Sequence, residues 1–340
     1  MMRLPYFAFH APTTVREAAD LIASSPGAML VAGGTDLLPN MKRRQQVPRT
    51  LVSLRRVGEL KEIANGDGLT LGAGLTLSGL VREARIRERY AALWQAASSV
   101  ATPHLRNMGT LGGNLCLDTR CNYYDQNYEW RRAIDFCMKK DGAICWVATG
   151  SPKCLAVSST DTAPALLALG ATVVLVSGDG TREIPVSDLY RNDGIEYLTR
   201  RPNEILTSVR LPRLDGWRST YWKLRRRGSF DFPVLSVAAA VKWGAGGTVE
   251  DAHLVLGAVS SRPVETPAAA ATLVGQRLTD DSIARAAELA AKPAKPMDNT
   301  DFNLLWRKRV VREFVTYALR ELRGDDMRDL RWKLSRQSQS

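Results

Sequence analysis

The chain has 340 residues, of which 45% are hydrophobic and 24% are charged, and its formal net charge is +12. This length predicts two or three structural units with enough apolar core to fold without disulfide staples. No signal-peptide pattern opens the sequence and no apolar run reaches the ~18 residues of a membrane span, so we expect a cytoplasmic protein whose positive charge suits an acidic partner or nucleic acid.

The first part of the chain predicts a small βαβ-like unit. Helical periodicity covers residues 15–25, a compact apolar strand follows at 28–31, and a second strand covers 50–54. Between the two strands, AGGTDLLPNMK (32–42) indicates a glycine turn that opens a helix.

The middle of the chain predicts further strands and helices. Apolar residues alternate and are interspersed with glycines at 69–79, and helical patterns continue to about residue 100. A second glycine turn, NMGTLGGNL, spans 107–115, and the segment 161–184 predicts a helix, a strand, a turn and another strand.

A change of composition near 212–220 indicates a domain boundary. The strand-like runs beyond it predict an antiparallel sheet, and helical patterns then close the chain. The strands are expected at 221–224, 234–243 and 248–260, the helices at 281–292 and 301–322, and a disordered tail at 334–340.

Four of the five cysteines lie close together in the sequence, with fifteen, seven and eight residues between them: Cys121, Cys137, Cys145 and Cys154. A reducing compartment disfavours a disulfide, and the short paired spacings of a zinc site are absent. A [4Fe–4S] cluster needs only four converging thiolates, for which aromatic neighbours such as Tyr123 and Trp146 would supply a shell. The spacing leaves a cluster, a zinc site and unrelated buried thiols open.

Two glycine turns are candidates for holding an anion. AGGTD (32–36) follows a strand and opens a helix, so its free N–H groups and the close approach that glycine allows favour a phosphate. GTLGGN (109–114) offers a second loop with Thr110 and Asn114 as side-chain partners, and Cys116 is expected to pack behind it as a small buried residue. Neither turn has a Rossmann or P-loop fingerprint, so if the two grip a dinucleotide from both sides, another fold holds it.

The motifs AGGTDLL, RNMGTLGGNLC and DTAPALLALGA, with the strand YWKLRRRGSFDFPVLSVA, resemble the FAD-binding subunits of molybdenum-containing hydroxylases, the xanthine dehydrogenase family, over nearly the whole chain. The resemblance implies an α+β fold of the PCMH/VAO type. In this fold a small α/β subdomain and a larger antiparallel-sheet subdomain bind FAD, and a C-terminal antiparallel sheet carries a helical bundle. The implied limits are 1–55, 56–215 and 216–325, with a tail at 326–340.

An insertion sets this chain apart from most members of that family, which have a short loop after GGNLC. Here about forty residues are inserted, at about 117–157, and they contain the four clustered cysteines. The insertion resembles the β subunits of 4-hydroxybenzoyl-CoA reductases, whose inserted loop binds a [4Fe–4S] cluster. The resemblance therefore implies a [4Fe–4S] cluster held by Cys121, Cys137, Cys145 and Cys154.

The resemblance also assigns FAD contacts to residues of this sequence. They lie in the first turn, in the second turn and beside the flavin: Ala32, Gly33, Gly34, Thr35, Asp36, Leu37, Thr110, Gly112, Gly113, Asn114, Asp161, Leu206 and Lys223. Asp161 has an alternative interpretation as a helix N-cap, and Lys223 has one as a solvated strand residue. No catalytic residue is expected in this chain, and the three histidines, His10, His104 and His253, are expected to be structural.

The implied function is electron transfer through FAD and [4Fe–4S]. The implied partners are a molybdopterin-binding large subunit and a small subunit with two [2Fe–2S] centres, in a dimer of heterotrimers, with no nucleic acid and no membrane. Closeness to the reductase implies inward flow from a ferredoxin to molybdenum, for reductive dehydroxylation of an aryl-CoA. The basic side chains Arg131, Arg132, Lys139 and Lys140 are expected either to dock an acidic ferredoxin or to form a solvated loop.

Two alternatives stay open. An oxidative molybdenum hydroxylase or aldehyde oxidoreductase would use the same cofactors to export electrons. A zinc-containing nucleic-acid-binding protein would account for the charge of +12, the cysteines and the stretch YWKLRRR, but it leaves both glycine turns unexplained.

Overall fold

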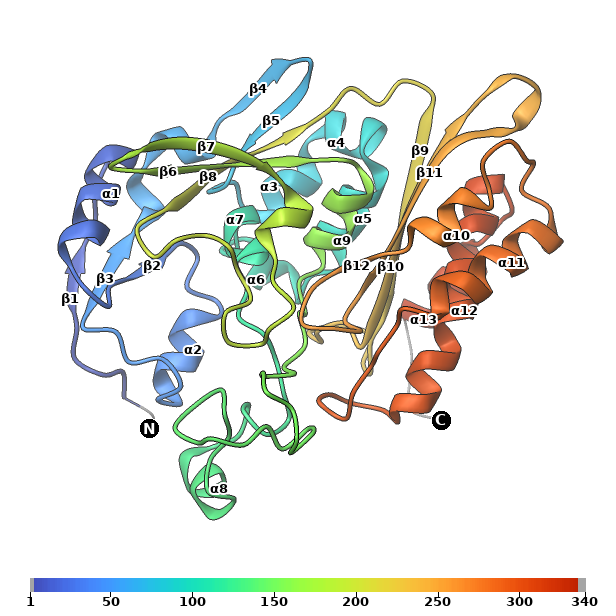
Figure 1. Cartoon of the computed structure of the whole chain (residues 1–340). Coiled ribbons are helices and arrows are strands. Elements are labelled where there is room, and N and C mark those ends of the chain that lie inside the picture. Colours follow the sequence, from blue (N-terminus) through green and yellow to red (C-terminus); the bar gives the residue numbers. More distant parts are fainter. Residues whose placement is uncertain (1–2, 336–340) are drawn as a thin grey trace.

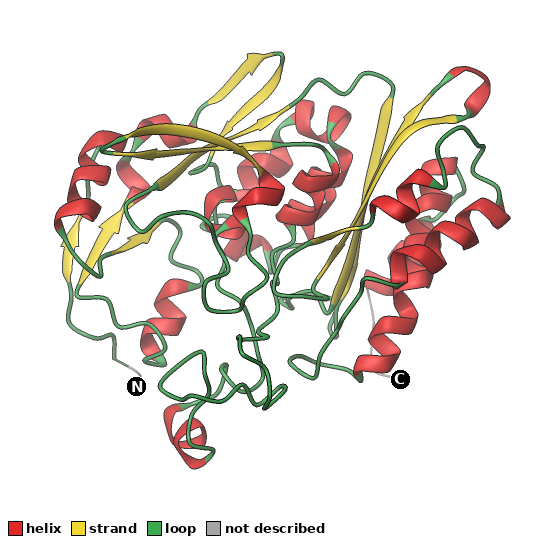
Figure 2. Ribbon diagram, in the orientation of Figure 1, coloured by secondary structure: helices red, strands yellow, loops and turns green. Residues whose placement is uncertain are grey.

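A computed structural model describes residues 3–335 as three sheets with helices packed against them (Figure 1; Figure 2). The first sheet is parallel, in the order β1-β3-β2, and confirms the expected βαβ-like unit. Strand β1 was not expected, because all three of its residues are exposed and no burial pattern marks them. The elements are β1 (Ala8–His10), α1 (Val15–Ser24), β2 (Met29–Val31), α2 (Leu37–Lys42) and β3 (Thr50–Ser53).

The second sheet has five antiparallel strands in the order β4-β5-β8-β6-β7. Helices pack against it around the main core, to which Leu71, Leu93 and Leu166 contribute fully buried side chains. The strands are β4 (Ile63–Gly66), β5 (Gly68–Gly72), β6 (Thr172–Ser177), β7 (Gly180–Pro185) and β8 (Ile205–Leu211). The helices are α3 (Leu77–Arg82), α4 (Ala84–Arg89), α5 (Ala91–Ser99), α6 (Pro103–Arg106), α7 (Leu111–Leu115) and α9 (Thr162–Ala168).

The third sheet is antiparallel, in the order β12-β11-β10-β9, and separates two cores. Along β10, Ala238 and Ala240 belong to the main core, while Val237, Ala239 and Val241 belong to a second core. The C-terminal helices cover this second face of the sheet (Figure 1). Burial on both faces explains the unbroken apolar run of this strand. The strands are β9 (Trp217–Leu224), β10 (Leu235–Trp243), β11 (Val249–Gly257) and β12 (Val264–Glu265), and the helices are α10 (Pro267–Ala271), α11 (Asp280–Ala291), α12 (Leu304–Arg323) and α13 (Arg328–Ser335).

The prediction of a tail at 326–340 is wrong for residues 328–335, because these residues form α13. Leu330 and Leu334 pack against the second core, and Arg331 pairs with Glu321 of α12. Because α13 ends at residue 335, it also includes the first two residues of the expected disordered tail, 334 and 335. The rest of the expected disordered tail, 336–340, lies outside the described residues.

The cysteine-containing insertion projects between α7 and α9 and is irregular apart from α8 (Tyr128–Ala133), at the lower edge of Figure 1. Two backbone hydrogen bonds between Arg120 and Val157, of 2.8 and 2.7 Å, close its neck. The N–H of Asn122 also donates to the carbonyl of Asn299 at 2.9 Å, which ties the insertion to the segment before α12. Over residues 3–335, no helix combines the length and apolar content needed to cross a membrane.

Candidate functional site

The two glycine turns lie against each other. A Cβ atom on Gly33 would stand 1.9 Å from the carbonyl oxygen of Met108, so only glycine permits this approach. Gly34 has a φ of +70°, in the left-handed region, and the hydroxyl of Thr35 lies close to Gly109. The structure therefore brings together two turns that are far apart in the chain.

The side chains of the second turn are held by the protein itself. Thr110 Oγ1 accepts the N–H of Gly113 at 3.1 Å and so caps α7. Asn114 Oδ1 accepts three hydrogen bonds, from the Thr160 hydroxyl (2.8 Å) and from the N–H (3.0 Å) and hydroxyl (2.6 Å) of Thr162. The amide oxygen of Asn114 thus fastens the turn to the start of α9.

Strand β8 is linked to the same turn through one intermediate residue. The N–H of Gly112 donates to the Ala73 carbonyl, and the N–H of Ala73 donates to the Thr207 carbonyl, both at 2.8 Å. Leu206, the neighbour of Thr207, is buried in the main core. Leu206 is therefore one residue away from the link between the sheet and the second turn.

Asp161 and Lys223, which were predicted separately, form a buried pair. Lys223 Nζ lies 3.0 Å from Asp161 Oδ2, the Tyr221 hydroxyl donates to Asp161 Oδ1 at 2.7 Å, and the two charged side chains are 4% and 3% exposed. Burial lowers the pKa of Lys223, and the Asp161 carboxylate opposes that shift. Asp161 does occupy the N-cap position of α9, although its side chain makes no capping hydrogen bond, whereas the interpretation of Lys223 as a solvated residue is wrong.

Arg120 connects the first turn to the cysteine segment, and sequence reasoning missed it. Its guanidinium contacts Asp36, Nη1 lies 3.5 Å from Asp125 Oδ1, and Asp125 Oδ2 accepts the N–H of Cys121 at 3.3 Å. The Phe232 ring centroid lies 4.8 Å from Cζ, and the buried Nε has no hydrogen-bond partner. A guanidinium with an unused donor beside a glycine turn suits a diphosphate. A lone arginine in a loop has no sequence pattern that would have identified it.

All four cysteines of the insertion are buried in one place. Cys121, Cys137 and Cys154 pack in one apolar cluster, and Cys145 lies within electrostatic range of Cys154. The N–H of Ala156 points to the sulfur of Cys154 at 3.4 Å, and all the thiols are free. Burial raises the pKa of Cys121 to about 12 and that of Cys154 to about 11, so these thiols are neutral at pH 7 without a metal.

This donor set fits an iron–sulfur cluster, since buried sulfurs, an aromatic shell and an N–H donor to sulfur are its usual surroundings. The shell includes Tyr123, Tyr124 and Trp146. Within residues 3–335, no group of three or more His, Cys, Asp or Glu side chains is placed to hold a metal ion. A tetrahedral zinc centre with Zn–S bonds of about 2.3 Å needs sulfurs about 3.8 Å from one another. No group among the described residues is arranged in this way.

The predicted basic docking patch is wrong for two of its four residues. Lys139 is 6% exposed, and its ammonium donates to Asp118 (2.8 Å), Thr119 (2.8 Å) and the carbonyl of Gly194 (2.6 Å). The Arg131 side chain is 1% exposed. Lys139 is buried where the insertion meets Gly194, and Arg131 is buried by residues of the insertion itself. The other two members of the patch, Arg132 and Lys140, are 64% and 32% exposed.

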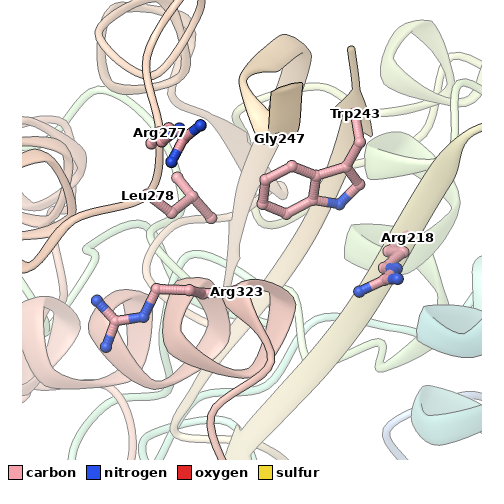
Figure 3. Close-up of a pocket in the computed structure, with 6 residues that line it drawn as sticks. All are labelled: Arg218, Trp243, Gly247, Arg277, Leu278 and Arg323. Atoms are coloured by element: carbon pink, nitrogen blue, oxygen red, sulfur yellow. The ribbon is translucent and has the colours of Figure 1, made fainter. Parts of the chain in front are cut away.

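A separate basic pocket of about 430 Å³ lies in the C-terminal unit (Figure 3). It is lined by residues of the third sheet and its helices: Arg218, Trp243, Gly247, Arg277, Leu278 and Arg323. Arg323 is already paired with Asp280 and Asp325, both at 2.7 Å. None of the predicted site residues lines this pocket.

Comparisons with known proteins match most of the chain. Residues 5–214 match the family described as FAD binding domain in molybdopterin dehydrogenase, and residues 219–322 match the CO dehydrogenase flavoprotein C-terminal domain. The chain is 33% identical to the FAD-binding subunit of aldehyde oxidoreductase from Escherichia coli (92% of this chain, 98% of the relative). It is 27% identical to the nicotinate dehydrogenase FAD-subunit of Eubacterium barkeri (90% and 92%).

The solved structure of carbon monoxide dehydrogenase from Hydrogenophaga pseudoflava includes a chain that superposes on this one with a TM-score of 0.76 at 25% identity. The match covers 98% of this chain and 99% of that one. Such similarity over both chains confirms the predicted fold class. The residue limits of its subdomains stay predictions.

Proposed function

This chain belongs to the family of FAD-binding medium subunits of molybdenum hydroxylases, and we propose that it transfers electrons through FAD and a [4Fe–4S] cluster in an aldehyde oxidoreductase-type complex. The observation that carries the proposal is the convergence of four buried cysteines in a segment tied to the expected FAD turns. The relatives are named aldehyde oxidoreductase, nicotinate dehydrogenase and carbon monoxide dehydrogenase, and the two dehydrogenase names describe oxidations. The proposed partners are a molybdenum-binding large subunit and an iron–sulfur small subunit, and the electrons leave the complex.

The residues around the two turns are proposed to hold FAD. The backbone of 32–37 and the Arg120 guanidinium would bind the diphosphate, and 110–114 would flank it. The Asp161–Lys223 pair and Leu206 are proposed to lie beside the flavin. When bound, FAD exchanges electrons either in pairs or singly, which matches a two-electron substrate to one-electron iron–sulfur centres.

Arg120→Met should weaken FAD binding about tenfold, because a charge-assisted contact to phosphate is lost, equivalent to about 1.4 kcal/mol. Titration of the flavin-free complex with FAD, followed by flavin fluorescence, measures the effect. The matched control is Arg16→Met, since the Arg16 side chain is 76% exposed and pairs with Asp20 one turn further along the same helix. Unchanged affinity in Arg120→Met would remove this residue from the FAD site.

The cluster is tested on anaerobically purified complex by analysis of iron, sulfide and zinc, together with EPR. We expect the loss of about four iron atoms per chain in Cys121→Ser and in Cys154→Ser. Cys116→Ser is the matched control, because this cysteine is partly buried beside the main core, outside the thiol cluster. Zinc in place of iron, or full iron in Cys121→Ser, would contradict the proposal.

A reductive enzyme of the 4-hydroxybenzoyl-CoA reductase type is the second candidate, favoured by the insertion with its four cysteines. It would take electrons from a ferredoxin, by way of the cluster and the flavin, towards an aryl-CoA. The order of the two reduction potentials separates the candidates. A cluster more easily reduced than the flavin supports export, and a cluster that is harder to reduce supports inward flow.

A further inference from the structure

Arg131, in α8, is a buried cation without hydrogen-bond partners. Its side chain is 1% exposed, and Nε, Nη1 and Nη2 all lack a partner. The carboxylate of Asp141 stands 3.6 Å from Nη1 and is itself 42% exposed. Five N–H donors are therefore withdrawn from water with one loose ion pair to compensate them.

A second buried arginine of the same chain shows how this fold normally satisfies such a group. Arg307 is fully buried and donates to three backbone carbonyls. The three acceptors are Val234 (3.1 Å), Met297 (2.9 Å) and Ala258 (2.6 Å). Because a buried charge is costly unless it is paired and hydrogen-bonded, the contrast indicates that the partner of Arg131 is a group the polypeptide does not supply.

The surroundings of Arg131 place it against the loop that carries Cys137. Its Cζ lies 5.8 Å from the ring centroid of Phe136, which directly precedes Cys137, and its carbonyl accepts the N–H of Phe136 at 2.7 Å. The backbones of Asp141 and Cys137 form an isolated β-bridge. The Gly142 N–H donates to the Cys137 carbonyl at 3.1 Å and closes this tight loop. Cys137 in turn packs with two of the other cluster cysteines.

We propose that Arg131 is the buried cationic partner of the [4Fe–4S] cluster and raises its reduction potential. This inference rests on the proposed function, since it requires the cluster. A cluster held by four thiolates is an anion that gains one further negative charge when it accepts an electron. A fixed positive charge close by, in a poorly solvated site, stabilises the reduced form more than the oxidised form. Arg131 is thus a positioning and tuning residue rather than a ligand.

The test is an EPR-monitored redox titration of the anaerobic complex carrying Arg131→Met or Arg131→Lys. We expect Arg131→Met to lower the ratio of reduced to oxidised cluster at a given potential about tenfold, which is about 59 mV for one electron. Arg131→Lys, which keeps the charge, should stay within about threefold of wild type. The flavin potential serves as the internal reference, and Arg132→Met, at a position 64% exposed, should change neither centre.

Iron-replete Arg131→Met with the wild-type potential would overturn the inference and leave the proposed function standing. If Arg131→Met loses its iron, Arg131→Lys decides the question. Retained iron with a near-normal potential in Arg131→Lys supports the role of the charge. Loss of iron from Arg131→Lys, or a shift as large as that expected for Arg131→Met, overturns the inference. Absence of iron from the wild-type complex would overturn both proposals.

Discussion

Gly33→Ala should purify without FAD. The added Cβ would stand 1.9 Å from the carbonyl oxygen of Met108 and 2.5 Å from its carbon, so backbone meets backbone and the two turns must move apart. Because the contacts proposed for the diphosphate depend on the fit between the turns, we expect FAD affinity to fall at least about a hundredfold, or more than about 2.7 kcal/mol. The ratio of flavin to protein absorbance, with titration of the flavin-free complex, measures the loss.

Gly58→Ala is the matched control for this prediction. Nothing lies within 4 Å of a Cβ at Gly58, which follows β3 in the same small unit, so this variant should keep its flavin. Wild-type flavin content in Gly33→Ala would show that the contact between the two turns is not required for FAD binding.

The glycine turns were recognisable from the sequence because glycine marks positions where a backbone must turn sharply or approach another closely. What each glycine approaches was not recognisable. Gly33 packs on Met108, and this contact depends on how two units with separate strand patterns dock. In the same way, Asp161 and Lys223 each drew attention in the sequence, but the ion pair between them arises only when β9 packs beside the start of α9.

Charged residues account for most of what sequence reasoning placed wrongly. Lysine and arginine are almost always on the surface, so Arg131 and Lys139 were assigned to an exposed docking patch. In the structure Lys139 ties the insertion to the carbonyl of Gly194, and Arg131 is buried against the loop that carries Cys137. A short irregular loop has no periodicity that separates an inward charge from an outward one.

The cysteine segment and the glycine turns form one connected unit, although they are separate motifs in the sequence. Arg120 contacts Asp36 of the first turn, and Asp125 joins Arg120 to the N–H of Cys121. A change in the packing of the insertion therefore reaches the first turn through a chain of charged contacts. This connection is a physical reason for proposing that FAD and the cluster lie on one electron path.

Asp161→Asn should lower the free energy of unfolding by about 3–5 kcal/mol at pH 7, because it leaves the Lys223 ammonium buried without its counter-charge. Lys223→Met should cost a similar amount by leaving the carboxylate buried. The double variant should recover much of the loss, since no unpaired charge remains. Urea unfolding followed by tryptophan fluorescence measures all three, and additive losses would show that the pair does not act as a unit.

The pH dependence of the stability of Asp161→Asn tests whether the buried charge of Lys223 causes the loss. Burial already holds the pKa of Lys223 below its usual 10.5, and removal of the carboxylate lowers that pKa further. A base whose folded pKa lies below its unfolded pKa binds fewer protons when folded, so between the two pKa values stability rises with pH. The deficit of Asp161→Asn should therefore shrink as the pH is raised from 7 towards 10, whereas Asp20→Asn, in an exposed pair with Arg16, should cost under about 1 kcal/mol throughout. A deficit that is constant with pH would mean that the charge of Lys223 is not the cause.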